Sequence, residues 1–178
     1  SYFDALMKKI ERLLILFRKE FAASRFVPYS FEQNVGMGKD GVKPIQIPLE
    51  NGTLSMIGVV DRVDVYEADG VKYLRVVDYK TGEKKFSFEK IKNGIDIQML
   101  MYLYALQQNL FPGQTCLPAG VQYIGSNPKT VRATRSQSPE TVLTQWEETM
   151  PRSGVYLKNN DVLHAMASTE TRTFLKIK

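Results

Sequence analysis

Apolar residues recur at helical spacing over the first 23 positions and then give way to the shorter runs typical of strands. Between residues 2 and 23 the apolar side chains lie three or four positions apart, with lysines and arginines between them, which predicts an amphipathic helix. We expect its apolar stripe to face a core rather than a membrane. The stripe consists of Phe3, Leu6, Ile10, Leu13, Leu14, Phe17 and Phe21.

Apolar, β-branched runs dominate the middle of the chain. Residues 54–66 and 71–80 predict two strands of a hairpin, joined across the turn residues 67–70. A strand is also predicted at 26–36, and a short extended piece at 44–49. The chain therefore passes from an N-terminal helix into a region of consecutive strands.

The rest of the chain alternates between the two periodicities. Helices are predicted at 88–92, 96–109, 139–149 and 159–167, and strands at 119–126 and 173–177. On the 96–109 helix we expect an apolar side of Ile97, Leu100, Met101, Tyr104 and Ala105. This order of elements indicates an α/β or α+β fold with a mixed sheet.

Composition is that of a globular domain. The 178 residues suffice for one domain with a real core; 43% are hydrophobic and 24% charged. No apolar run approaches the ~18–20 residues that cross a bilayer, and no signal peptide precedes the first helix, so we expect no membrane partner and a cytoplasmic location. A start at Ser1 suits a fragment of a longer protein. The single cysteine, Cys116, excludes a disulfide framework and any cysteine-held zinc or iron–sulfur cluster within this chain, and we expect it in the core or a loop.

Carboxylates and a lysine occur at the ends of the two hairpin runs. Because side chains alternate along a strand, Asp78 and Lys80 point to one face while Val77 and Tyr79 point to the other. Together with Asp61, they predict a divalent-metal site with a cationic helper. The alternative is that they are ordinary edge-strand charges, but so apolar a strand has little reason to carry an unpaired charge. Oxygen ligands favour Mg²⁺ or Mn²⁺ over zinc.

Three motifs carry a resemblance to a known family: Gly-x-x-Asp-Arg-x-Asp at 58–64, Asp-Tyr-Lys-Thr-Gly at 78–82, and a Gln and a Tyr four residues apart at 98 and 102. Together they resemble the RecB-type branch of the PD-(D/E)XK nucleases. Segments 117–124 and 153–166 are similar to the C-terminal nuclease region of the AddB family, whose members are subunits of bacterial helicase–nucleases. The resemblance begins near residue 26 and continues to the end of the chain.

The resemblance implies an α/β fold with a restriction-endonuclease-like core, in which helices flank a mixed central sheet. It predicts a single nuclease domain over 1–178, with an N-terminal amphipathic helix at 1–25, a catalytic core at 26–126 and a C-terminal extension at 127–178. Many AddB-type modules also carry four cysteines that bind a [4Fe–4S] cluster, and RecB-type enzymes often add an upstream histidine to the metal shell. This chain departs from both patterns, since its only histidine is His164.

We assign the metal to Asp61 and Asp78, and the resemblance adds the backbone carbonyl of Tyr79. A hard divalent ion needs only one or two protein carboxylates because it keeps several waters. Lys80 is expected either to orient or deprotonate the attacking water, or to neutralise charge that develops on the phosphate.

Four further residues have less certain roles. Gln98 and Tyr102 are one helical turn apart and share a face, which we expect to be the more polar side of the helix; the resemblance implies that they orient the catalytic lysine and contact the DNA backbone. Glu32 is expected to complete the metal shell or hold Lys80, or to have no functional role. Asp64 shares a strand face with Arg62, and a structural ion pair between them is favoured over a metal ligand.

The formal charge of +5 permits a polyanionic partner without requiring one. Basic residues gather after the Asp-Tyr-Lys strand and again near residue 130. Solvated loops would explain either group alone, but beside a phosphodiesterase site phosphate contacts are favoured, and we predict Lys84 and Lys85 as DNA-binding residues. The two groups are Lys84, Lys85, Lys90 and Lys92, and Lys129, Arg132 and Arg135.

Three functional hypotheses follow. The favoured one is a Mg²⁺-dependent deoxyribonuclease, an exonuclease that trims single-stranded DNA delivered by an AddA-type helicase partner during double-strand-break processing and recombinational repair in the bacterial cytoplasm. The others are a nuclease fold that binds DNA without activity, and a scaffold that docks a helicase. The complete set of predicted site residues argues against the inactive module.

Overall fold

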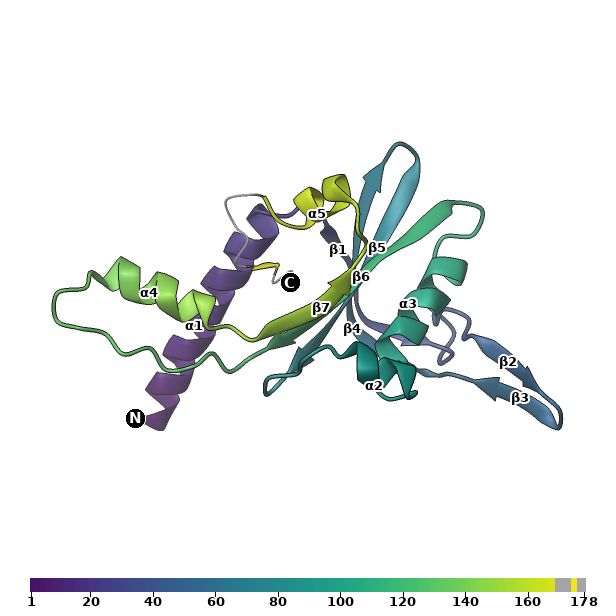
Figure 1. The fold of residues 1–178 in the computed structure, drawn as a ribbon, viewed down its shortest axis with the longest axis horizontal. Coiled ribbons are helices and arrows are strands. Elements are labelled where there is room, and N and C mark those ends of the chain that lie inside the picture. Colours follow the sequence, from purple (N-terminus) through teal and green to yellow (C-terminus); the bar gives the residue numbers. More distant parts are fainter. Residues whose placement is uncertain (169–173, 176–178) are drawn as a thin grey trace.

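A five-stranded mixed sheet forms the centre of the computed structural model, which describes residues 1–168 and 174–175 (Figure 1). The strand order is β1-β4-β5-β6-β7, with β5 and β6 parallel and the other neighbours antiparallel. A mixed sheet flanked by helices confirms the predicted fold class. The strands are β1 (Val27–Val35), β4 (Gly58–Ala68), β5 (Val71–Lys80), β6 (Thr115–Gly125) and β7 (Arg152–Tyr156).

Helices cover both faces of this sheet, and each face has its own hydrophobic core. α3 (Gln98–Asn109) packs on one face, where its buried residues meet Val76 and Val121 of the central strands. α1 (Tyr2–Ala22) and α5 (Asn160–Met166) pack on the opposite face around Phe26. The remaining elements are α2 (Phe88–Lys92), α4 (Pro139–Glu148) and a separate hairpin of β2 (Gln46–Leu49) and β3 (Gly52–Ser55).

Buried charges hold the face that meets α1. The Asp64 carboxylate lies 2.9 Å from Arg62 Nε and 2.7 Å from Arg75 Nη2, and all three side chains are at most 2% exposed. On the same side of the molecule, Glu20 of α1 and Arg152 of β7 form a second buried pair at 2.8 Å. The structural ion pair predicted between Arg62 and Asp64 is therefore confirmed. Because its oxygens are committed to guanidinium groups, Asp64 is a structural residue.

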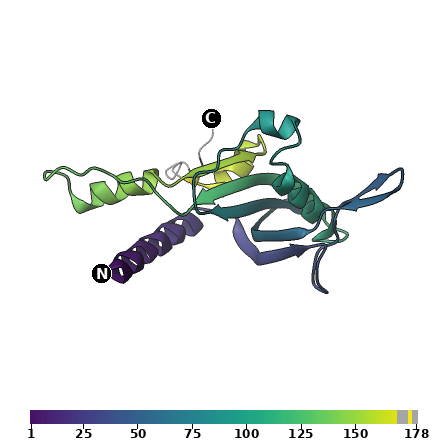
Figure 2. The same ribbon diagram turned by 90° about the horizontal axis from the view of Figure 1, so that it is seen from below.

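The predicted core-facing stripe of the first helix is only partly correct. Leu16 is 1% exposed, but Phe3, Leu6 and Ile10 are 66%, 41% and 40% exposed. Figures 1 and 2 show the reason: the N-terminal half of α1 runs out beyond the sheet, in the same direction as α4. Helical periodicity identifies an apolar face but not the length over which another element covers it.

Two strand predictions also need correction. The predicted strand 54–66 is interrupted at 56–57, so that its first part pairs with β2 and the rest, from Gly58, joins the main sheet. β7 has no counterpart among the predicted elements, because a five-residue strand with an arginine and a central glycine lacks alternating hydrophobicity. It lies in the region predicted as a C-terminal extension yet completes the main sheet. Most of the closing strand predicted at 173–177 lies outside the described residues.

Among the described residues, no helix is both long enough and apolar enough to cross a membrane.

Substituting Asp64 by alanine should lower the free energy of unfolding by about 3–5 kcal/mol, because Arg62 and Arg75 would remain buried without their shared counter-charge. Urea denaturation followed by circular dichroism measures the change. Asp40→Ala, in an exposed turn, is the matched control and should stay within about 0.5 kcal/mol of the wild type. A loss below ~1 kcal/mol for Asp64→Ala would show that the two arginines find other partners.

Candidate active site

The end of β5 presents its polar residues to a cavity beneath α3. Asp78 and Lys80 line this cavity of about 410 Å³, and Lys80 Nζ lies 2.6 Å from Asp78 Oδ2. Tyr79, between them, points to the other face, where its ring meets Phe17 edge-on. The predicted alternation of side chains along this strand is confirmed. The carboxylate and the ammonium therefore share one concave, partly enclosed space.

Gln98 and Tyr102 enter the same cavity from the first turns of α3. Gln98 Nε2 donates to Tyr102 Oη at 2.7 Å, and the hydroxyl donates in turn to the carbonyl of Ile57 at 3.0 Å. Gly58 makes this approach possible, since a Cβ built there would lie 1.7 Å from Tyr102 Oη. The first glycine of the Gly-x-x-Asp motif and the tyrosine of the helix motif are thus a packed pair.

The predicted apolar side of this helix is wrong. Tyr102 is 2% exposed and packs in the core with Met99, Leu103 and Leu106, whereas Tyr104, assigned to the apolar side, is 51% exposed. The helix also begins at Gln98, not at Asp96, whose φ of 61° is left-handed. Tyr102 can occupy the core because its one polar atom is hydrogen-bonded there.

Asp61 lies at the end of the β4–β5 ladder. The ladder's last pair joins Arg62 to Val77, so that one further step places Asp61 opposite Asp78. Asp61 Oδ2 accepts a hydrogen bond from the backbone N–H of Tyr79 at 2.7 Å, which holds the carboxylate against the end of β5. The two predicted metal-binding carboxylates are thereby brought to neighbouring strand ends, although Asp61 does not line the cavity itself.

Glu32 lies on β1 at the level of Asp61, because Phe31 pairs with Arg62 and Gln33 with Val60. Its φ of 49° is unusual for a residue with a Cβ. The side chain is exposed and does not line the cavity. The structure therefore brings Glu32 to the same end of β4 as Asp61, but not to Asp78 or Lys80.

The structure separates the two lysines that were predicted to bind DNA. Lys84 lines the cavity, where Nζ lies 3.0 Å from Asp96 Oδ1 and 4.8 Å from the centre of the Tyr123 ring. The Lys85 side chain is 82% exposed and lies outside this cavity. Lys84 and Lys85 are thus adjacent in sequence but belong to different surfaces.

Asp96 is a cavity residue that the sequence patterns did not identify. The hydrogen bond from Lys84 is the main cause that lowers its pKa below the ordinary value, with smaller contributions from the charges of Lys84, Lys90 and Lys80. Its position two residues before the Gln-x-x-x-Tyr motif was the available signal, but helical spacing placed the residue within the helix. The left-handed backbone turns it out of the helix and toward the lysine.

The donor set suits a hydrated divalent ion better than an all-protein cage. Among residues 1–168 and 174–175, no cluster of three or more histidine, cysteine or acidic side chains is arranged to hold a metal. Asp78 Oδ2 is buried and, apart from the ion pair with Lys80, has no hydrogen-bond donor within the part of the chain that the structure describes. Asp61 and Asp78 together offer the two carboxylates that Mg²⁺ needs when waters supply the remaining ligands.

This fold and this site define a class of protein. The family model of the PD-(D/E)XK nuclease superfamily matches residues 1–170, and the chain belongs to that superfamily.

Its relatives are subunits of helicase–nucleases. The chain is 32% identical over 165 residues to the AddB-type ATP-dependent helicase/deoxyribonuclease subunit of Caldanaerobacter subterraneus subsp. tengcongensis, covering 92% of this chain and 14% of the relative. The proteins of the same name from Clostridium perfringens (strain ATCC 13124) and Ruminiclostridium cellulolyticum are 31% and 29% identical, covering 95% and 92% of this chain and 15% and 14% of the relatives. The chain thus spans about one seventh of the length of these curated relatives.

Replacing Lys84 by methionine should raise the pKa of Asp96 toward its ordinary value, because it removes the main hydrogen-bond donor. In the wild type the depressed pKa means that the pair is stabilising above the ordinary carboxylate pKa and is lost as the pH falls through the folded-state value. Carboxyl ¹³C chemical shifts, followed against pH, measure the pKa.

Lys90→Met is the matched control for this titration. Lys90 Nζ lies 3.9 Å from Asp96, against 3.0 Å for Lys84, so its removal should raise the pKa of Asp96 less. An unchanged Asp96 pKa in Lys84→Met would contradict the pairing.

Proposed function

We propose that this chain is a metal-dependent deoxyribonuclease module that hydrolyses DNA phosphodiester bonds. The observation that carries the proposal is the cavity shared by Asp78, Lys80, Gln98 and Tyr102, with Asp61 at the adjoining strand end. An acidic pair, a lysine and buried hydrogen-bond donors at one end of a nuclease-family sheet are suited to binding a phosphate and a water together.

Asp61 and Asp78 would hold Mg²⁺ or Mn²⁺, together with the carbonyl of Tyr79. When bound, such an ion lowers the pKa of a water and offsets negative charge on the phosphate. The protein's own part is to hold the two carboxylates at neighbouring strand ends. The Tyr79 N–H hydrogen bond keeps Asp61 in that position.

Lys80 has the task of orienting the water or stabilising the developing negative charge. Its ammonium lies 2.6 Å from Asp78 and is 40% exposed, so that it meets both the carboxylate and an incoming phosphate. Gln98 and Tyr102 have a supporting role, because the Tyr102 hydroxyl is already engaged with Gln98 and Ile57. That hydroxyl fixes the wall of the cavity rather than taking part in proton transfer.

The names of the relatives suggest the biological setting. The proteins that match are called helicase/deoxyribonuclease subunits, and we propose that this chain acts as their nuclease part, as an exonuclease on single-stranded DNA delivered by a helicase partner. Double-strand-break processing and recombinational repair in the bacterial cytoplasm would be its role.

Asp78→Ala should abolish magnesium-dependent digestion of end-labelled single-stranded DNA, with a loss of at least ~10²-fold. The side chain lines a cavity rather than the core, so the thermal unfolding midpoint should change little. Asp40→Ala, an exposed carboxylate remote from the cavity, is the control and should digest DNA like the wild type. Digestion by Asp78→Ala at the wild-type rate would show that the site is assigned wrongly.

Lys80→Met distinguishes an enzyme from an inactive metal-binding module. A protonated amine has no lone pair for a metal, so manganese affinity measured by calorimetry should stay constant or rise slightly. Cleavage should fall by at least ~10²-fold, the low end for a positioned acid–base or electrostatic group. Lost manganese binding would make Lys80 a structural part of the site, and unchanged cleavage would remove it from the mechanism.

A further inference from the structure

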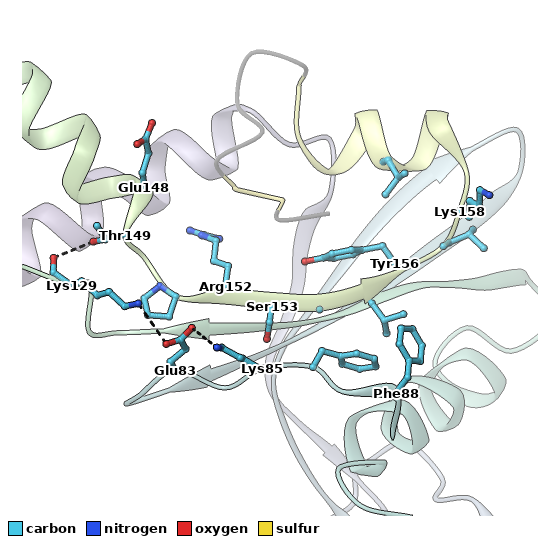
Figure 3. Close-up of a pocket in the computed structure, with 16 residues that line it drawn as sticks. Glu83, Lys85, Phe88, Lys129, Glu148, Thr149, Arg152, Ser153, Tyr156 and Lys158 are labelled. Atoms are coloured by element: carbon cyan, nitrogen blue, oxygen red, sulfur yellow. Dashed lines mark hydrogen bonds and ion pairs between the residues drawn. The ribbon is translucent and has the colours of Figure 1, made fainter. Parts of the chain in front are cut away.

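A second, larger hollow lies on the other side of the segment that carries Lys84. It has a volume of about 1060 Å³ and runs between residues 83–88 and the edge strand β7 (Figure 3). We call it the β7 groove. Figure 3 shows Glu83, Lys85 and Lys129 near one end and Phe88 toward the other, with Ser153 pointing from β7 to the same side.

The β7 groove and the candidate active site share a wall. The Lys84 side chain enters the active-site cavity, while its neighbours Glu83 and Lys85 line the groove. The Ser153 hydroxyl of β7 donates to the carbonyl oxygen of Lys84, which fixes this wall against the sheet. A chain that leaves the cavity across residues 83–88 therefore enters the groove directly.

Lysines at one end of the groove are available to a polyanion. Lys85 and Lys129 share a single carboxylate, Glu83, at 4.0 and 3.9 Å, and their side chains are 82% and 73% exposed. Exposed pairs of this length contribute little, so phosphates can replace Glu83 at small cost. With Lys158 also lining the groove, three exposed lysines stand against the two carboxylates Glu83 and Glu148.

Aromatic rings line the other end. Phe86 and Phe88 contact each other edge-to-face, with ring centres 5.3 Å apart, and Phe88 is 66% exposed. Exposed rings beside a basic groove are the combination by which proteins bind single strands, since every base has a face that can stack. An aliphatic surface of the same size would offer no such stacking.

The outer edge of β7 adds outward-facing hydrogen-bonding groups. β7 is the last strand of the sheet among the described residues. Pro151 and Leu157 bond to β6, so the alternation of an antiparallel ladder turns the backbone groups of Arg152, Gly154 and Tyr156 outward. Such N–H groups bind phosphate oxygens, and they also pair with an extended peptide. The lysines and the shared wall with the active-site cavity favour the nucleic acid.

We propose that the β7 groove binds the single-stranded DNA next to the nucleotide being cleaved. The phosphates contact Lys85 and Lys129, and bases stack on Phe88. The proposal rests on the proposed nuclease function, because that function is what makes the neighbouring cavity a phosphodiester site. The groove would hold the substrate strand in place while Asp78 and Lys80 act on one bond.

The test measures binding of fluorescein-labelled oligo(dT) to the 178-residue chain in EDTA, where cleavage is prevented. Lys85→Glu/Lys129→Glu should weaken binding at least ~10-fold and flatten the logarithmic salt dependence by about 1.4 for two lost contacts on a single strand. Lys39→Glu/Lys43→Glu, two exposed lysines that do not line the groove, changes the net charge equally and should have a much smaller effect. Equal affinities for the two double variants would overturn the proposal.

Phe88→Ala provides an independent arm that leaves the charge unchanged. It should weaken oligo(dT) binding at least ~5-fold through lost stacking, and because Phe88 is largely exposed the thermal midpoint should not move. Wild-type affinity in this variant would exclude stacking. If both groove variants keep DNA affinity but lose binding of an acidic extended peptide, the groove is a protein-docking edge and the proposal is overturned.

A small phosphodiester separates failure of the groove from failure of the active site. The p-nitrophenyl ester of thymidine 5′-monophosphate is too short to reach the groove, so the groove variants should hydrolyse it at the wild-type rate while Asp78→Ala should not. Hydrolysis with normal DNA binding by the groove variants would reject the groove alone. Hydrolysis by Asp78→Ala would reject the active-site assignment, leaving the binding measurements in EDTA to decide on the groove.

Discussion

The buried Asp64 carboxylate, held between Arg62 and Arg75, fixes the register on which the candidate site depends. Asp64 and Arg75 are directly opposite in the β4–β5 ladder, so their ion pair forms only when these strands are aligned as observed. A slip of one residue would turn each strand's side chains to the opposite face and leave charges buried without partners. The same alignment places Asp61 opposite Asp78 at the end of the ladder.

The two faces of β5 therefore have separate tasks. One carries the arginine–carboxylate network that joins the sheet to α1, with the Arg62 guanidinium over the Phe21 ring. The other carries Asp78 and Lys80 beneath α3, where Gly58 and Tyr102 fix the helix against β4. A rigid, charged network on one face can thus support partly exposed polar residues on the other, as a functional site requires.

Local patterns predicted the strands well because each depends on neighbouring residues. The alternation at Asp78, Tyr79 and Lys80 and the pairing of Arg62 with Asp64 follow from the period of a strand. The faces of the helices were predicted less well. Tyr102 was assigned to a polar face, yet its hydroxyl is hydrogen-bonded within the core. The exposed half of α1 likewise depends on how far the sheet extends beneath it.

The sequence by itself determined the mixed α/β fold, the family resemblance and the residue types of the candidate site, because these lie in short motifs whose spacing is preserved along the chain. Only the tertiary structure decided which of them meet. It brought Asp96 to Lys84, left Glu32 on the surface and placed Lys84 and Lys85 on opposite sides of one segment. Such contacts join elements far apart in sequence or depend on a single left-handed residue, and no local periodicity encodes either.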